Sequence, residues 1–253
     1  MATSPETKDE YAPILEGPGV SDYERYLRTD ELLSLQKTED ERAHHDELLF
    51  QTVHQASELW LKLAWTEAEL ATQHLRAGEL APASRLLRRS IGCLQRVDAA
   101  LDMLEFLAPW EYTRWVRPVL GHGSGFDSPG FRQFRRVAPE LGAAFHEQRR
   151  AAGLSVVELY QRNREFEELY TVAELLIELD ERIGVWRIRH LKVIGRIIGE
   201  GQVGTQGTPV ELLAGLIHQK LYPEFWEARN ELTALANEQI TGDSRSPTPG
   251  HGA

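Results

Sequence analysis

The sequence contains little cysteine, no long apolar segment and fewer basic than acidic residues, and each shortage excludes a class of protein. Its single cysteine, Cys93, cannot form an intramolecular disulfide, which suits a reducing compartment. Cys93 lies in an apolar helical pattern, so we expect a buried structural thiol. No apolar run approaches the ~18 residues that a membrane-spanning helix requires, so the sequence predicts a protein that does not cross a membrane.

The charge balance excludes partners that carry strong negative charge. The 253 residues include 28 Lys and Arg against 39 Asp and Glu, which gives a formal charge of −11. Such a surface disfavours nonspecific binding to nucleic acid or to an anionic membrane. The N-terminus, MATSPETKDEYAP, is polar and acidic and resembles neither a signal peptide nor a transit peptide. We therefore expect a cytoplasmic protein with no nucleic-acid or membrane partner.

Most of the chain has the period of amphipathic helices, and no segment alternates convincingly as a strand. Long helices with short connections predict an all-α fold, an antiparallel helical bundle. We expect a single domain over residues 21–240, with a flexible arm at 1–20 and a disordered tail at 241–253. Helices are expected at about 40–75, 81–107, 131–152 and 156–198, the last broken near Arg162, and again after Pro209 and Pro223.

The first long helix carries two groups of residues on different faces. An apolar stripe at helical spacing predicts its core-facing side, formed by Leu49, Val53, Ala56, Trp60, Leu63 and Leu70. Phe50 and His54 are four residues apart and share another face. Phe50 could stack on a flat aromatic ligand, and His54 could accept a hydrogen bond from an N–H donor. From spacing alone, a purely structural role for this pair stays open.

His190 shares an apolar helix face with Ile183, Trp186, Val193, Ile194 and Ile197. A histidine in such a place is most often a core residue bonded to a neighbour. The functional alternative is an axial heme ligand, because heme is flat and mostly apolar and its iron ligand often projects from an apolar helix face. Arg187 and Arg189 flank His190 and could reach the carboxylates of such a cofactor, although they could equally be solvated charges.

Two glycine-rich loops could complete a binding site. The first, Arg117 to Ser128, contains a guanidinium, which is the natural partner of a carboxylate. The second contains Gly204, Thr205 and Gly207 and could close over a ligand. Neither loop is a phosphate-binding signature, and the chain has no HExxH, no cysteine cluster and no GxSxG. A di-iron bundle would need two Glu-x-x-His motifs, and only Glu41–His44 is present.

Six segments together resemble the tryptophan 2,3-dioxygenase family, which belongs to a superfamily of histidine-ligated heme proteins. They are DYERYLRTDELLSLQ at 22–36, HHDELLFQTVHQASELWLK at 44–62, RPVLGHGSGFDS at 117–128, WRIRH at 186–190, the GTQG loop, and LYPEFWEAR at 221–229. The second segment is highly specific, and the others follow in the family's order. The resemblance implies an all-helical enzyme that uses heme b as cofactor and O2 as co-substrate.

The resemblance also implies roles for individual residues. His190 would be the axial ligand of the heme iron, and His54 would accept the indole N–H. Phe50 would pack against the indole. At the other end of the substrate, Arg117 would bind the carboxylate and Thr205 would hold the ammonium or carboxylate group. The remaining substrate-pocket residues would be Ser124, Tyr112 and, reaching in from a neighbouring subunit, Tyr23, Tyr26 and Leu27. A shared pocket implies a homo-oligomer, a tetramer or a dimer.

The chain departs from the family pattern in three places. It is a few tens of residues shorter between the SGF-S motif and the helix of His190. The stretch from Tyr112 to Arg117 holds one residue more than usual, and the GTQG loop is shifted by one residue. These departures bear on loop closure and on substrate identity, because some members of the superfamily insert one oxygen atom into aromatic amino acids in natural-product pathways.

The sequence therefore predicts an oxygenase acting on the indole ring of L-tryptophan or a substituted tryptophan. Dioxygenation would give an N-formylkynurenine-type product. The first alternative is mono-oxygenation to a 2-oxindole or a hydroxylated indole in secondary metabolism. The second is a heme-binding sensor without turnover, which the amino-acid clamp of Arg117 and Thr205 argues against.

Overall fold

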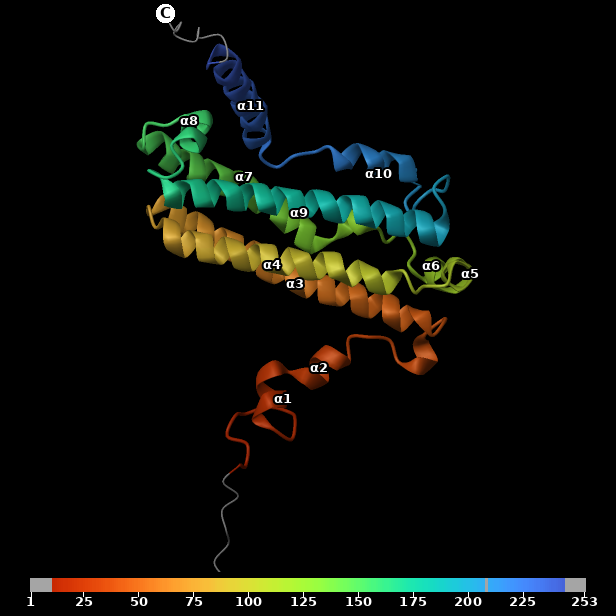
Figure 1. Ribbon diagram of the computed structural model, residues 1–253. Coiled ribbons are helices and arrows are strands. Elements are labelled where there is room, and N and C mark those ends of the chain that lie inside the picture. Colours follow the sequence, from red (N-terminus) through yellow and green to blue (C-terminus); the bar gives the residue numbers. More distant parts are fainter. Residues whose placement is uncertain (1–10, 208, 244–253) are drawn as a thin grey trace, which may run out of the picture.

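The computed structural model describes residues 11–207 and 209–243. Within these ranges it contains helices and no strand, apart from one isolated bridge between Val203 and Pro209, so the all-α prediction is confirmed. Four long helices form the bundle, and each runs opposite to the long helix before it (Figure 1). They are α3 (Asp46–Arg76), α4 (Leu80–Leu104), α7 (Pro129–Ala151) and α9 (Glu167–Ile198). Helix α3 packs against α4 and α7, and α4 packs against α9.

Short elements fill the connections and cover the ends of the bundle. Between α4 and α7 lie α5 (Pro109–Glu111), the π-helical turn η2 (Tyr112–Val116), α6 (Arg117–Val119) and the 3₁₀ turn η3 (Gly125–Asp127). Helix α8 (Val156–Gln161) precedes α9, α10 (Val210–Ile217) packs on α9, and α11 (Pro223–Asp243) contacts α8. The N-terminal elements are α1 (Asp22–Leu27), α2 (Thr29–Leu33) and η1 (Glu39–Glu41), and α1 and α2 lie away from the bundle (Figure 1).

The expected break in the helical segment at 156–198 is confirmed, since α8 ends at Gln161 and α9 begins at Glu167. Local capping explains where α8 begins. Ser155 caps its N-terminus by accepting the amide of Glu158, whose side chain in turn accepts the amide of Ser155. Helix α11 extends to Asp243, so residues 241–243 of the expected tail are helical. The rest of that tail, 244–253, and the first half of the expected arm, 1–10, lie outside the described residues.

The apolar stripe expected to face the core on α3 is partly wrong. Trp60, Leu63 and Leu70 are 40%, 37% and 42% exposed, whereas the alanines of the same helix at 64, 68 and 71 are fully buried. The reason is that α3 lies between α4 and α7, and small side chains allow its backbone to approach both neighbours closely. The larger apolar residues lie on the outer face of the bundle. Cys93 is 5% exposed, as expected for a structural thiol.

Two polar side chains of α9, Asp180 and Arg187, anchor the segment that follows the candidate-site helix. Asp180 is 2% exposed and accepts hydrogen bonds from the amides of Leu221 and Tyr222 and from Nε1 of Trp226. Arg187 donates to the carbonyl oxygens of Leu216 and Gln219. These contacts hold the segment between α10 and α11 against α9. No helix in the described ranges is long and apolar enough to cross a membrane.

Candidate active site

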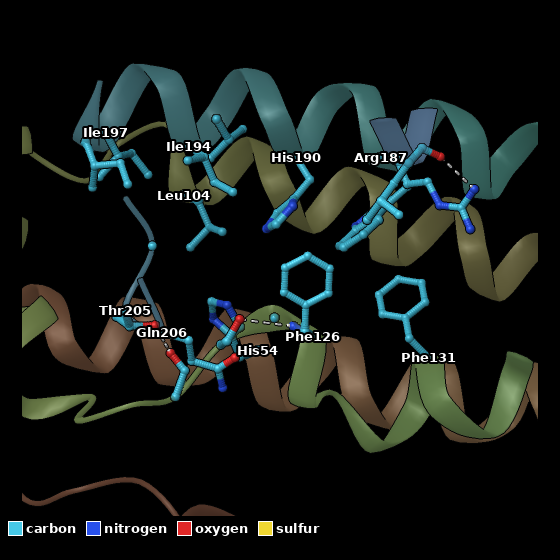
Figure 2. Close-up of a pocket in the computed structure, with 18 of the residues that line it drawn as sticks. His54, Leu104, Phe126, Phe131, Arg187, His190, Ile194, Ile197, Thr205 and Gln206 are labelled. Atoms are coloured by element: carbon cyan, nitrogen blue, oxygen red, sulfur yellow. Dashed lines mark hydrogen bonds between the residues drawn. The ribbon is translucent and has the colours of Figure 1, made fainter. Parts of the chain in front are cut away.

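A cavity of about 530 Å³ lies at one end of the bundle, within the size range of small-molecule sites. Its walls come from α3, the end of α4, the segment 112–126, α7, α9, the loop after α9 and the segment 216–221. Figure 2 shows His190 projecting into the cavity from α9, with His54 on the opposite wall. The apolar face expected on α9 lines the cavity in full, through Ile183, Trp186, His190, Val193, Ile194 and Ile197.

The imidazole of His190 is held by aromatic stacking. Its ring lies 4.7 Å from that of Trp186, one helical turn earlier, with an angle of 9° between the planes, and Phe131 packs on the far side of Trp186 at 4.3 Å. Burial lowers the pKa of His190 to about 4, and the nearby His54 adds to the effect. The ring is therefore neutral at pH 7, the protonation state that can bind a metal ion. Among the described residues, His190 belongs to no cluster of metal-binding side chains, so it could supply only a single protein ligand.

Gly125 faces the free edge of that imidazole. A Cβ atom added to Gly125 would lie 3.7 Å from Cε1 and 3.8 Å from Nε2 of His190. A larger residue at this position would therefore lie in van der Waals contact with the ring edge that carries Nε2. The expected binding residue Ser124 precedes it, and its hydroxyl caps the turn η3 by accepting the amide of Phe126 at 3.3 Å. Ser124 and Phe126 also line the cavity.

Phe50 and His54 form a stacked pair on α3, with ring centroids 4.1 Å apart. Nδ1 of His54 lies 2.7 Å from the carbonyl oxygen of Phe50, which can only accept, so Nδ1 donates and Nε2 is left as an acceptor. The imidazole opens onto the cavity, yet burial by the surrounding protein lowers its pKa despite the opposing effects of the Phe50 carbonyl and Glu58. A neutral His54 can therefore accept a hydrogen bond from a ligand.

Tyr112 and Arg117 are joined by the π-helical turn η2, the conformation suited to the additional residue expected from the sequence between them. The amide of Arg117 donates to the carbonyl of Tyr112, five residues earlier, where an α-helix would use a four-residue step. A π turn accommodates one additional residue, so both side chains still line the cavity. Tyr112 lies 5.8 Å from the ring of Phe50, and burial raises the pKa of its hydroxyl.

Arg117 and Thr205 meet at the end of the cavity formed by the two glycine-rich loops. Arg117 donates to the carbonyl of Val203, and the hydroxyl of Thr205 donates to the carbonyl of Gly123. Both side chains are therefore bonded to main-chain oxygens of the facing loop. The expected clamp residues lie together, although they are far apart in the sequence.

The opposite end of the cavity carries a second positive charge, at Arg187 (Figure 2). Burial lowers the pKa of the Arg187 guanidinium, and the nearby Arg135 adds to this effect. Arg189 points elsewhere, because it pairs with Asp98 and Asp102 of α4. Arg135, on α7, was missed by the sequence analysis, since no motif marks it and only the packing of α7 against α9 brings it to the cavity. No Asp or Glu is found among the described residues that line the cavity.

Tyr23, Tyr26 and Leu27 do not reach this cavity within their own chain. They lie on α1, outside the bundle, and are 69%, 78% and 44% exposed. Of the ten residues predicted from the sequence to form the site, the structure brings seven together around one cavity: Phe50, His54, Tyr112, Arg117, Ser124, His190 and Thr205.

The chain is similar to known proteins over most of its length. A family model described as tryptophan 2,3-dioxygenase matches residues 12–150. The tryptophan 2,3-dioxygenase of Bacillus anthracis is 31% identical over 261 aligned positions, covering 83% of this chain and 92% of the relative. The enzyme of Caulobacter vibrioides is 33% identical, with coverages of 83% and 98%. That of Myxococcus xanthus is 31% identical, with coverages of 85% and 91%.

The alignment with the Bacillus anthracis enzyme also shows a difference in length. Since 83% of the 253 residues is about 210, about 50 of the 261 positions aligned with the Bacillus anthracis enzyme have no counterpart in this chain. This agrees with a chain that is a few tens of residues shorter than its relatives. The identity and coverage nevertheless show common descent over most of the chain, and the chain belongs to the tryptophan 2,3-dioxygenase family, whose members are heme-dependent oxygenases.

Proposed function

We propose that the protein binds heme b through His190 and inserts oxygen from O2 into the indole ring of tryptophan or a substituted tryptophan. The observation that carries this proposal is the opposition of two neutral histidines, His190 and His54, across an apolar cavity with Arg117 at one end. His190 would hold the cofactor, and His54 would meet the substrate. Family membership supplies the class of reaction, and the cavity supplies the residues.

The residues present fit heme in three respects. His190 is a neutral ligand, and Gly125, which faces the ring edge that carries its Nε2, has no side chain. The walls beside it are aliphatic and aromatic, as a porphyrin requires. Arg187 and Arg135 carry positive charge at one end of the cavity, and no Asp or Glu lines the cavity in the described part of the chain, so they suit the propionates. Heme, when bound, supplies the activation of O2.

The remaining residues would orient the substrate. Arg117 would exchange the carbonyl of Val203 for the substrate carboxylate, and Thr205 would exchange the carbonyl of Gly123 for a polar group at the same end of the substrate. Nε2 of His54 would accept the indole N–H, and the ring would pack on Phe50. Fixing both ends of the substrate directs the C2–C3 edge of the indole, and such positioning supplies much of the rate of an oxygen insertion.

Electron balance separates the two possible outcomes. In dioxygenation both oxygen atoms enter the substrate, the C2–C3 bond breaks, and no external reductant is consumed. In mono-oxygenation one atom enters the indole and the other leaves as water, which requires two electrons from a reductant. We propose dioxygenation first, because six of the expected substrate residues, Phe50, His54, Tyr112, Arg117, Ser124 and Thr205, line one cavity. Mono-oxygenation is the alternative, because the chain is shorter than its relatives.

The test is mass spectrometry of the product formed from L-tryptophan and ¹⁸O₂ by the heme-loaded, ferrous protein, with and without added reductant. Two labelled atoms in the product support dioxygenation, and one labelled atom with reductant-dependent turnover supports the alternative. Heme and tryptophan binding without any product would instead favour the sensor.

A further inference from the structure

The two loops that meet over the end of the cavity are held by three hydrogen bonds. Arg117 donates to the carbonyl of Val203, and Thr205 donates to the carbonyl of Gly123. In the third, Nε2 of Gln206 donates to Oδ2 of Asp127 at 2.7 Å. The partners of this third bond are 79 residues apart, so it joins segments that only the fold brings together.

The three bonds differ in what a bound substrate would do to them. Arg117 and Thr205 are the groups proposed to hold the amino-acid end of the substrate, and they must release Val203 and Gly123 to do so. The bond between Gln206 and Asp127 uses neither clamp residue, and Asp127 does not line the cavity. It is therefore the one contact of the three that can persist while a substrate is bound.

We propose that Gln206 and Asp127 form a latch that positions the substrate clamp, and this inference rests on the proposed function. Gln206 directly follows Thr205, and Oδ2 of Asp127 also accepts the amide of Ser124 at 3.1 Å. The latch thus joins Thr205 on one loop to Ser124 on the other through short, stiff connections. Gln206 and Asp127 are positioning residues that act through these two neighbours.

The loop of Gln206 is stiff enough to transmit this restraint. The amide of Gly207 donates to the carbonyl of Gly204 at 3.0 Å, and a positive φ of 74° lets Gly207 close this turn. Val203 and Pro209 are bridged across the base of the turn. Fixing Gln206 at one point therefore fixes Thr205, and the acceptor of the fixing bond is a carboxylate, which makes it stronger than a bond between neutral groups.

The test is a reciprocal exchange of the two side chains in the heme-loaded protein. Gln206→Glu places two carboxylates together, and Asp127→Asn weakens the acceptor while leaving an oxygen for the amide of Ser124. The double variant Asp127→Asn with Gln206→Glu restores one donor and one acceptor in reversed order when the amide at position 127 turns its nitrogen toward residue 206 and its oxygen toward the amide of Ser124. Gln202→Ala, an exposed residue of the same loop, is the matched control.

We expect each single variant to raise KM for L-tryptophan about 10-fold, with kcat within about 2-fold and heme content unchanged, because the latch acts on the clamp and not on the reacting atoms. The double variant should recover most of the lost affinity, and Gln202→Ala should match the parent protein. A double variant no better than Gln206→Glu alone would overturn the proposal, as would an unchanged KM in Gln206→Ala.

Hydrogen exchange separates failure of the latch from failure of the proposed function. In heme-loaded protein without tryptophan, Gln206→Ala should speed hydrogen exchange of the backbone amides in residues 203–207. In the double variant, exchange of these amides should be slower than in Gln206→Glu. If the parent protein neither binds nor oxidises tryptophan, the proposed function fails and the exchange result alone decides the latch. If exchange in 203–207 is the same in Gln206→Ala and in the parent, the latch is absent.

Discussion

At the scale of single residues, the site depends on keeping two histidines uncharged in one cavity. Burial lowers the pKa of both His190 and His54, and each then has a nitrogen lone pair available at pH 7. The carbonyl of Phe50 decides which nitrogen of His54 that is. The two rings can therefore serve different partners, a cofactor for His190 and an indole N–H for His54.

The first prediction concerns the axial ligand. His190→Gly should remove heme from the purified protein, because the proposed iron ligand is lost, and added imidazole should restore part of the heme absorbance by filling the same space. His122→Gly is the control, since His122 is exposed on the loop before Ser124. The measurement is the heme-to-protein ratio by absorbance. Normal heme content in His190→Gly would contradict the assignment.

The glycine opposite His190 gives a second prediction that does not depend on turnover. Gly125→Ala adds a methyl group 3.7–3.8 Å from the imidazole edge, in the space proposed for the porphyrin. We expect heme affinity in absorbance titrations to fall by about 10-fold or more, with the helical circular dichroism unchanged. Gly184→Ala on α9 is the control, because a Cβ atom there would meet nothing within 4 Å and Gly184 does not line this cavity. Unchanged heme affinity would place the cofactor elsewhere.

The third prediction concerns the carboxylate clamp. Arg117→Ala should weaken tryptophan binding by about 2–5 kcal/mol, the loss typical of a buried charge partner, with heme content unchanged. Arg114→Ala is the matched control on the same π turn, because Arg114 packs over the rings of Trp110 and Trp115 at the surface. Optical titration of the heme-loaded protein measures both. Equal affinities would mean that the carboxylate binds at another position.

At the scale of elements, the sequence predicted the buried face of one helix completely and that of another only in part. The periodicity of α9 predicted its cavity face in full, because all six residues belong to one regular helix. The core-facing side of α3 was predicted only in part, because α3 packs closely against both α4 and α7, and the side chains buried there are small alanines. Arg189 pairs with α4, and Arg135 reaches the cavity from α7. Both positions depend on how the helices pack, which the local sequence pattern does not predict.

The π turn gives a fourth prediction at this scale. Deleting Thr113 should convert the five-residue π step between Tyr112 and Arg117 into a four-residue α-helical step, which leaves both side chains on the same face because each step is close to one helical turn. We expect tryptophan affinity and heme binding to stay close to those of the parent protein, as measured by optical titration. Thr113→Ala keeps the chain length and should also bind like the parent. A loss of tryptophan affinity in the deletion variant alone would show that the site depends on the additional residue.

At the scale of the whole molecule, two groups of apolar side chains stay exposed in the part of the chain that the structure describes. Helix α1 exposes Tyr23 and Tyr26 away from the bundle, and the outer face of α3 exposes Trp60, Leu63 and Leu70. The family resemblance offers one explanation for α1, a pocket shared between subunits of a homo-oligomer. Under that proposal the cavity seen in one chain is incomplete until a second copy supplies its α1.

A shared pocket makes a prediction that a self-contained one does not. One variant carries Tyr23→Ala and Tyr26→Ala, and the other carries Arg117→Ala; each alone should have little activity. In oligomers that mix the two, some pockets combine an intact α1 from one chain with an intact Arg117 from the other, so activity should reappear. We expect up to about a quarter of the parent value in the unselected mixture if pairing is random, and about a half in purified mixed dimers, where one pocket of two is intact. Co-expression with two affinity tags isolates the mixed oligomers for assay. If each pocket were built from one chain, mixing would restore nothing, because no single chain would carry both intact parts.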